Sequence, residues 1–547
     1  MNPGGTALTA TVTTTNLDDD RVRLRPVPTG ASSPRLRRIA WAPTLRWVVP
    51  LLVVSLVAAA HLVNMFHAPA LFDDEGTYDS EAWALLHHGT LSHYTYWYDH
   101  PPLGWMTLAG WFLVTLAYPL HLDLFNAGRI MMLGCTVASA GLLYVLVRRL
   151  HARAWAAGLA VLLFGLTPLG MVWQRETLLD NMATPLLIAA FALSLSPRQR
   201  LVAAVGATAA LALAILMKET SALYAPFVIW QLWQTTAAPR RRITMCLAGT
   251  IGVLILALYP TYALIKGEFF PGRNHVSLTW ALWWQLAERK GGGSAVTSHS
   301  ATQLAVLSWL HADWPLLACA LGCSIFVLIT IRIGRPVAAA MLLLAVLPLR
   351  SGYLPAPYII GVLWPAAAVI GIAVDRLVAA RAGRRRIYTR PRRAQVVRGI
   401  SVATSTSVVV LAAVLALGRD VRMDKASWTS NPVGTQRAAY RWVASNLPPG
   451  SVVVVDNSAW LYLVDHGFPE QTTLWSPKVD LDPAVRDRLQ AGWRSIRYIV
   501  DSPVLRDTVA QSPIVREALA HGEVIATFGV GADNEIQILR IAENPGS

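Results

Sequence analysis

The residues with the clearest chemical potential lie in LFDDEGTYDSEAWALLHHGTLSHYTYWYDHPPLGW, between positions 71 and 105. This stretch follows an apolar run and carries six carboxylates but no lysine or arginine. Asp73, Asp74 and Glu75 are adjacent, and crowding raises the pKa of at least one such carboxyl unless a cation or a bound hydroxyl compensates. The triplet is therefore a candidate general-base site. A solvated acidic loop is the competing interpretation.

Two further motifs bring charged or imidazole groups to the ends of apolar segments. DHPPLG offers Asp99 and His100 as metal or phosphate ligands, held by two prolines, although the same motif can simply start a helix. RETLLDN puts Asp180 inside an otherwise apolar helix. A carboxylate there is costly, so it either pairs with Arg175 or lines a cavity.

Cationic and phenolic groups recur at other span ends. Lys218 in MKETS is one of five lysines in a chain with forty-two arginines, and it either snorkels to the interface or binds phosphate. Arg350 and Tyr353 in RSGYLPAPY could hold a phosphate or anchor a helix at the membrane surface. A divalent ion would need an imidazole from His275, His299 or His311, each of which can equally be an ordinary surface histidine.

The composition places these residues in a multi-span membrane protein. Of the 547 residues, 54% are hydrophobic and only 14% charged, and the mean hydropathy is positive. The net charge of +15 comes from arginine runs between apolar segments, which is typical of a polytopic protein rather than of a nucleic-acid-binding one. The four cysteines lie inside apolar spans and are expected to be small buried hydrophobes.

Eleven apolar stretches are candidate membrane spans. They lie near 47–66, 130–147, 154–173, 177–195, 201–217, 219–237, 243–265, 314–331, 353–374 and 400–418, with a shorter one at 336–350. The segment 103–120 is ambiguous. If it crosses the bilayer, most arginine runs fall outside, whereas if it lies in the interface they all fall inside, so the second arrangement is preferred.

Three regions follow from this topology. Residues 1–45 are expected to be a disordered cytoplasmic tail, and 46–419 a transmembrane domain with outer loops at 67–128 and 266–313. Residues 420–547 alternate helical and strand-like patterns and predict a small extracytoplasmic α/β domain. The unusual chemistry then lies on the outer face of the membrane.

Taken together, FDDEGTY, DHPPLG, RETLLDN and LPAPY resemble the motifs of the protein mannosyltransferase and aminoarabinose transferase group of membrane-embedded C-type glycosyltransferases. The resemblance covers roughly residues 40–420, and the outer domain looks like those appended to actinobacterial members. It implies a polytopic helical fold with interfacial helices in the first outer loop. It also implies a polyprenyl-phosphate-linked sugar as donor, reaction at the outer membrane face and inversion at the anomeric carbon.

The resemblance also supplies roles. Asp74 would be the base that deprotonates the acceptor hydroxyl, with Glu75 shaping the site and Asp180 as a second acid held by Arg175. The aminoarabinose branch has a lysine before the paired prolines, where His100 stands here, so other cations would hold the phosphate. The implied substrate contacts are Tyr78, His100, Arg129, Arg175, Lys218, Arg350, Tyr353 and Tyr358, and the implied ligands of a zinc, magnesium or manganese ion are Asp99 and His299.

The expected function is that of a monomeric hexosyl- or pentosyltransferase in a bacterial cell membrane, acting on a glycan, lipid or protein acceptor and on no nucleic acid. A polytopic transporter or lipid flippase using Asp180 and Lys218 is the alternative. That alternative predicts inverted repeats and charges near mid-membrane, and neither is visible in the sequence. A sensor or scaffold with a ligand-binding outer domain is a third reading.

Overall fold

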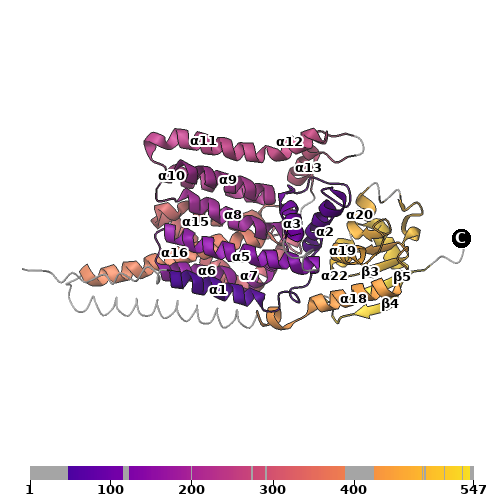
Figure 1. Cartoon of the computed structure of the whole chain (residues 1–547). Helices are drawn as coiled ribbons and strands as arrows, with labels where there is room; N and C mark the ends of the chain where they lie inside the picture. The colour runs from indigo at the N-terminus through magenta and orange to yellow at the C-terminus, as the bar shows by residue number, and fades with distance from the viewer. Residues whose placement is uncertain are drawn as a thin grey trace, which may run out of the picture. The chain divides into compact units, whose positions relative to one another are not determined.

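The structure is a computed structural model that describes residues 47–542, except 115–121, 199, 273–274, 290–291, 388–423, 483–484, 486–487, 510–511 and 532–533. The predicted tail at 1–45 and the predicted span at 400–418 lie outside the described residues. What is described is mainly helical, with one small sheet near the C-terminus (Figure 1).

Apolar helices make up the membrane part. They are α1 (Val48–Leu62), α5 (Leu124–Arg149), α6 (Ala154–Gly165), α7 (Pro168–Trp173), α8 (Leu179–Ser194), α9 (Leu201–Met217), α10 (Ala225–Thr235), α11 (Ala238–Leu256), α12 (Leu258–Ile265), α14 (Ala301–Thr330), α15 (Arg335–Val346) and α16 (Tyr358–Ile387). In the described chain, five helical stretches are long and apolar enough to cross a bilayer: Leu124–Arg149, Ala238–Ile265, Ala301–Thr330, Arg332–Leu349 and Ala356–Ala380. Shorter apolar helices include α1, α8 and α9.

Helix α16 lies in the interior of this bundle. Its apolar window is 89% buried, and α6, α14 and α15 pack on it. Small residues allow the close approach: a side chain at Gly371 would meet the Ala156 carbonyl oxygen at 2.8 Å. In α14, Asp313 has non-helical dihedral angles two residues before Pro315, whose ring disrupts the preceding turn.

The first outer loop is helical because its sequence carries the matching end signals. Helix α2 (Asp73–His88) has three carboxylates in its first turn, where they favour the positive end of the helix dipole. It ends at Gly89 in the left-handed conformation, with His87 and His88 in the last turn. Stabilisation of α2 therefore explains in part why three acidic residues are adjacent at its start.

Helix α3 (Leu103–Val114) lies across the ends of the bundle helices. Near its start, Gly104 approaches Leu179, the first residue of α8. Near its end, the Trp111 indole donates to the Ala127 carbonyl, in the first turn of α5, at 2.9 Å. Both ends of α3 thus meet the same ends of the bundle, as expected of an interfacial helix and not of a span.

The C-terminal region is the predicted α/β domain. Its sheet has the order β2-β1-β3-β5-β4, with β1 parallel to β2 and β3, and β5 antiparallel to β3 and β4. The elements are α18 (Pro432–Asn446), β1 (Val453–Val455), α19 (Asn457–Asp465), β2 (Thr473–Trp475), α20 (Ser476–Leu481), β3 (Tyr498–Asp501), α22 (Pro503–Thr508), α23 (Pro513–Ala520), β4 (Gly522–Phe528) and β5 (Ile536–Ile541). The sequence patterns predicted the other helices and strands in this chain order but missed the short β2, α20 and α22.

Candidate active site

The carboxylates of the first turn of α2 have unequal surroundings. Glu75 is fully buried and accepts two hydrogen bonds from Arg129, at 2.9 Å from Nε and 2.8 Å from Nη2. It also accepts from the backbone N–H and the hydroxyl of Thr177, at 3.2 and 3.3 Å. Asp74 is only partly buried. Of the two residues predicted to do chemistry here, Asp74 is the accessible one.

A lysine at the end of α9 gathers groups from four chain segments. Lys218 Nζ lies 3.3 Å from the Tyr78 hydroxyl, 3.1 Å from His100 Nε2 and 3.9 Å from Asp180 Oδ2. His100 Nδ1 lies 2.9 Å from Glu219 Oε2, at the start of the 3-10 helix η2 (Glu219–Tyr224). We call Asp74, Tyr78, His100, Asp180, Lys218 and Glu219 the Lys218 cluster.

The electrostatics tie Asp74 to this cluster. Burial raises the pKa of Tyr78 well above its ordinary value, and the charges of Asp74, Asp180 and Glu219 raise it further. The charge of Asp74 also acts on Lys218. Burial and the Lys218 charge lower the pKa of His100. The charge and hydrogen bond of Glu219, together with the Asp99 charge, outweigh them, so the net pKa is raised. Three carboxylates therefore surround one ammonium and one imidazole.

Arg129 and Arg175, two of the predicted substrate-binding cations, hydrogen-bond to other parts of the protein. Arg129 is buried and, besides Glu75, donates to the carbonyls of Met65 and Ala70. Its guanidinium therefore donates four hydrogen bonds to groups inside the protein.

The predicted pairing of Arg175 with Asp180 is wrong. Arg175 donates to the carbonyls of Ala60, Val63, Ala68 and Ser427 at 2.9 to 3.4 Å. The arginine turns toward the end of α1, while Asp180, the second residue of α8, turns toward Lys218. Sequence spacing could not show this, because it does not reveal which way the chain turns between the two residues.

The late span end contributes one aromatic surface. Tyr353 is 47% exposed, and the Arg289 guanidinium lies 3.4 Å from the centroid of its ring. Arg350 is exposed, and the Tyr358 hydroxyl donates to the Leu344 carbonyl at 2.9 Å. Tyr353 thus offers a partly exposed surface, whereas Tyr358 braces α15.

The predicted metal site lacks a ligand set. Among the described residues, no group of three or more His, Cys, Asp and Glu side chains could hold a metal ion. Asp99 Oδ1 accepts from its own neighbour, the His100 N–H, at 3.1 Å, and the backbone of His299 donates to Gln303. These two residues therefore do not form a zinc site, which needs three or four protein ligands.

The α/β domain borders α2. Asn457 donates to the Thr77 hydroxyl at 2.8 Å, and Trp83 packs edge-on against Trp460 with ring centroids 5.6 Å apart. Burial, the Asp74 charge and the Asp456 charge raise the pKa of Asp73 to about 8, against a hydrogen bond with Trp475. The domain therefore sets the environment of a residue adjacent to Asp74.

Sequence reasoning missed Glu219, Arg289 and Asp73 as members or neighbours of the site. Glu219 had a signal, since it follows Lys218 in MKETS at a span end. Arg289 had none, because its partner Tyr353 is distant along the chain. Asp73 was grouped with Asp74, although only the folded chain separates their surroundings.

Residues 99–261 match the family model described as dolichyl-phosphate-mannose-protein mannosyltransferase. ArnT from Cupriavidus metallidurans bound to undecaprenyl phosphate has a TM-score of 0.54 at 17% identity, covering 91% of this chain and 98% of its own. The Archaeoglobus fulgidus oligosaccharyltransferase in the apo form has a TM-score of 0.51 at 13% identity, covering 90% of this chain and 75% of its own. No curated protein sequence gave a significant match.

The chain has the fold of the membrane-embedded C-type glycosyltransferases. The resemblance predicted from the four motifs is thereby confirmed, as is the predicted architecture of a helical membrane part with a small C-terminal α/β domain. Glycosyltransferase is the enzyme class both of these solved relatives and of the matching family.

Proposed function

We propose that this protein transfers a sugar from a polyprenyl-phosphate-linked donor to an acceptor hydroxyl, with inversion, at the outer face of a bacterial cytoplasmic membrane. The observation that carries the proposal is the Lys218 cluster, which brings carboxylates, an ammonium and an imidazole to one end of a C-type glycosyltransferase fold. The match to a mannosyltransferase family and the undecaprenyl phosphate named for ArnT support the donor class.

The reaction needs a base and a stabilised leaving group. Asp74 is proposed to take the proton of the acceptor hydroxyl as its oxygen attacks the anomeric carbon from the face opposite the phosphate. The bond between the anomeric carbon and the phosphate oxygen breaks, and the polyprenyl phosphate leaves with both bonding electrons. Lys218 and His100 are the cations placed to stabilise that charge. Asp180 orients Lys218 and is proposed to bind a sugar hydroxyl.

The remaining predicted residues take supporting places. Glu75 and Arg129 position α2 and are not proposed to touch substrate. The Tyr78 hydroxyl lies 3.3 Å from Lys218 Nζ, and Tyr353 interacts electrostatically with Lys218. Both tyrosines therefore offer aromatic or phenolic groups near the Lys218 cluster.

A transporter or flippase is less favoured by the position of the charges. Asp180 is the second residue of α8, and Lys218 directly follows the last residue of α9. Charges that carry a substrate through a membrane are expected near mid-span. The pair instead lies where α3 crosses the helix ends.

Two carboxamide variants test the proposal. Asp74→Asn and Asp180→Asn should fold but lose sugar transfer from a polyprenyl-phosphate sugar in membranes, by roughly a hundredfold or more for the base. Asp465→Asn, an exposed acid at the end of α19, is the matched control and should transfer at the wild-type rate. Wild-type transfer by Asp74→Asn would rule out its role as base.

A further inference from the structure

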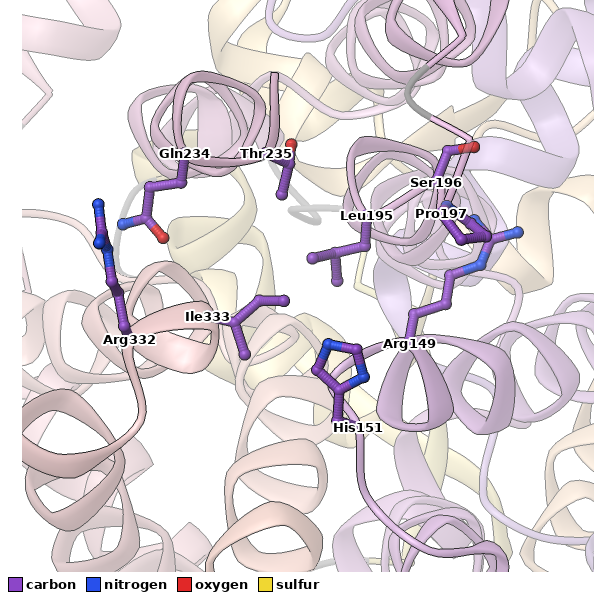
Figure 2. Close-up of a pocket in the computed structure, with 9 residues that line it drawn as sticks. All are labelled: Arg149, His151, Leu195, Ser196, Pro197, Gln234, Thr235, Arg332 and Ile333. Atoms are coloured by element: carbon purple, nitrogen blue, oxygen red, sulfur yellow. The ribbon is translucent and has the colours of Figure 1, made fainter. Parts of the chain in front are cut away.

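A cavity of about 500 Å³ lies among the ends of α5, α8, α10 and α14. Nine residues line it: Arg149, His151, Leu195, Ser196, Pro197, Gln234, Thr235, Arg332 and Ile333. Figure 2 shows the His151 ring between Arg149 and Ile333, with Leu195 facing them. Its volume falls within the usual range of small-molecule sites.

This cavity is at the opposite end of the bundle from the Lys218 cluster. Asp180 stands at the start of α8, and Leu195 follows its last residue. At about 1.5 Å per residue, the two ends of that helix are roughly 22 Å apart. Arg149 likewise ends α5, whose first turn touches α3. The cavity is therefore separate from the candidate active site and plays no part in the proposed transfer.

The lining is cationic and donor-rich. Arg149 and Arg332 contribute two guanidinium groups and His151 an imidazole, while none of the nine lining residues that the structure describes carries a carboxylate. Ser196, Thr235 and Gln234 add hydroxyl and amide groups. Leu195, Pro197 and Ile333 supply apolar surface between these polar groups.

The charged walls are fixed by helix-end contacts. Arg149 Nη1 donates to the Ala192 carbonyl of α8, which anchors the guanidinium while leaving its other nitrogens available. The Thr235 hydroxyl donates to the Ser194 carbonyl at 2.7 Å and so joins α10 to the end of α8. His151 has a φ of +65°, a conformation that turns the chain sharply after α5 and presents the ring to the cavity. The cavity is thus held open by three connected helix ends.

We propose that this cavity binds a phosphate group, presented either by free phosphate or by an anionic phospholipid. The phospholipid would belong to the membrane leaflet on the side of the protein's arginine runs. The Arg149 and Arg332 guanidinium groups stand on opposite sides of the cavity (Figure 2), and each can pair with phosphate oxygens. A cationic cavity between helix ends suits an anionic headgroup. The apolar surface of Leu195, Pro197 and Ile333 fits the glycerol and first acyl carbons of a lipid. A bound lipid would join the ends of α5, α8, α10 and α14.

Native mass spectrometry of the full-length protein tests this site. The protein in detergent is titrated with phosphatidylglycerol, with phosphatidylcholine of the same chains, and with phosphatidylglycerol plus inorganic phosphate. We expect saturable binding of phosphatidylglycerol, roughly tenfold weaker in Arg149→Gln and in Arg332→Gln for each lost charge-assisted contact. Competition by millimolar inorganic phosphate would identify free phosphate as the ligand, and its absence would identify the lipid.

Arg242→Gln is the matched control, because it removes an exposed arginine at the start of α11 that does not line the cavity. It should bind phosphatidylglycerol as the wild type does. Arg332 is exposed, so its variant keeps the test decisive if Arg149→Gln misfolds. The proposal is overturned if Arg332→Gln binds phosphatidylglycerol as tightly as the wild type, if Arg242→Gln weakens binding equally, or if phosphatidylcholine binds as well.

Discussion

Asp73 and Asp74 are neighbours in the first turn of α2 but face different partners. Asp74 acts on Lys218 and Tyr78, whereas Asp73 lies beside Asp456 and Trp475 of the α/β domain. Because the pKa of Asp73 is raised to about 8, that carboxyl is neutral near pH 7. A neutral Asp73 adds no negative charge beside Asp74, the residue proposed as the general base.

Asparagine at position 73 should therefore mimic the neutral acid. We expect Asp73→Asn to retain sugar transfer within about twofold at pH 7, in contrast to Asp74→Asn. The stability of the wild-type protein should also change with pH in a defined direction. Asp73 has a pKa of about 8 when folded and near 3.8 when unfolded. Between these values only the unfolded state has lost the proton, so raising the pH weakens folding, and the effect ends above pH 8.

Melting temperatures of purified protein at pH 5 and pH 8 check this expectation. The melting temperature should fall less between pH 5 and pH 8 in Asp73→Asn than in the wild type. In the exposed control Asp465→Asn it should fall by as much as in the wild type. An equal decrease in Asp73→Asn and the wild type would show that Asp73 ionises normally in the folded protein.

At the scale of elements, one buried ion pair connects three segments. Glu75 in α2 accepts from Arg129 in α5 and from Thr177 just before α8. Arg129 also holds the chain between α1 and α2 through the carbonyls of Met65 and Ala70. The pair fixes the start of α2, and hence the place of Asp74, relative to the helix ends that carry Asp180.

Breaking this pair should cost stability more than chemistry. Glu75→Gln leaves Arg129 buried without its counter-ion, and such losses are typically about 3 to 5 kcal/mol. Adding Arg129→Met should restore part of the melting temperature, because it removes the uncompensated charge. Thermal unfolding of the three variants measures this. If Glu75→Gln melts like the wild type but transfers no sugar, Glu75 acts in the reaction itself, as its sequence position suggests.

The sequence predicted elements better than pairings. Hydrophobic runs and end signals located the helices, because each depends on neighbours within a few residues. Asp74, Asp180, His100 and Lys218 could be chosen because polar groups beside apolar spans are costly and usually functional. Their partners could not be chosen, since Lys218 meets Asp180 only through the packing of α8 on α9.

At the scale of the whole molecule, the α/β domain shares a hydrophobic core with the first outer loop. That core joins Leu71, Trp83 and Phe125 of the membrane part to Tyr440 and Trp460 of the domain. Around it, Gln436 exchanges two hydrogen bonds with the backbone of Leu71, at 2.8 and 3.1 Å. The domain is therefore part of the structure that positions α2.

The contact between α2 and α19 is close enough to test with one methyl group. A Cβ at Gly76 would lie 2.5 Å from the backbone nitrogen of Ser458, which cannot move without displacing α19. Gly76→Ala should lower stability by about 1 to 3 kcal/mol and reduce transfer, because α2 carries Asp74. Gly110→Ala is the control, since nothing lies within 4 Å of its added carbon. Equal melting temperatures for both variants would mean that α19 does not hold α2.

The orientation of the whole molecule is the last expectation to test, and it depends on α3. Because α3 lies across the bundle ends, the arginine runs at the end of α5, after α8 and in the first turns of α11 fall on the face opposite the Lys218 cluster. The positive-inside rule then predicts that the cluster and the α/β domain lie outside the cytoplasm. In intact cells, a membrane-impermeant maleimide should label Asp465→Cys in the α/β domain. It should label Ala237→Cys, before α11, only after the cells are opened. Both side chains are exposed, and parent cysteines Cys246 and Cys319 are replaced by serine to remove background. The reverse labelling pattern would put the Lys218 cluster on the cytoplasmic face, where an extracytoplasmic sugar transfer could not occur.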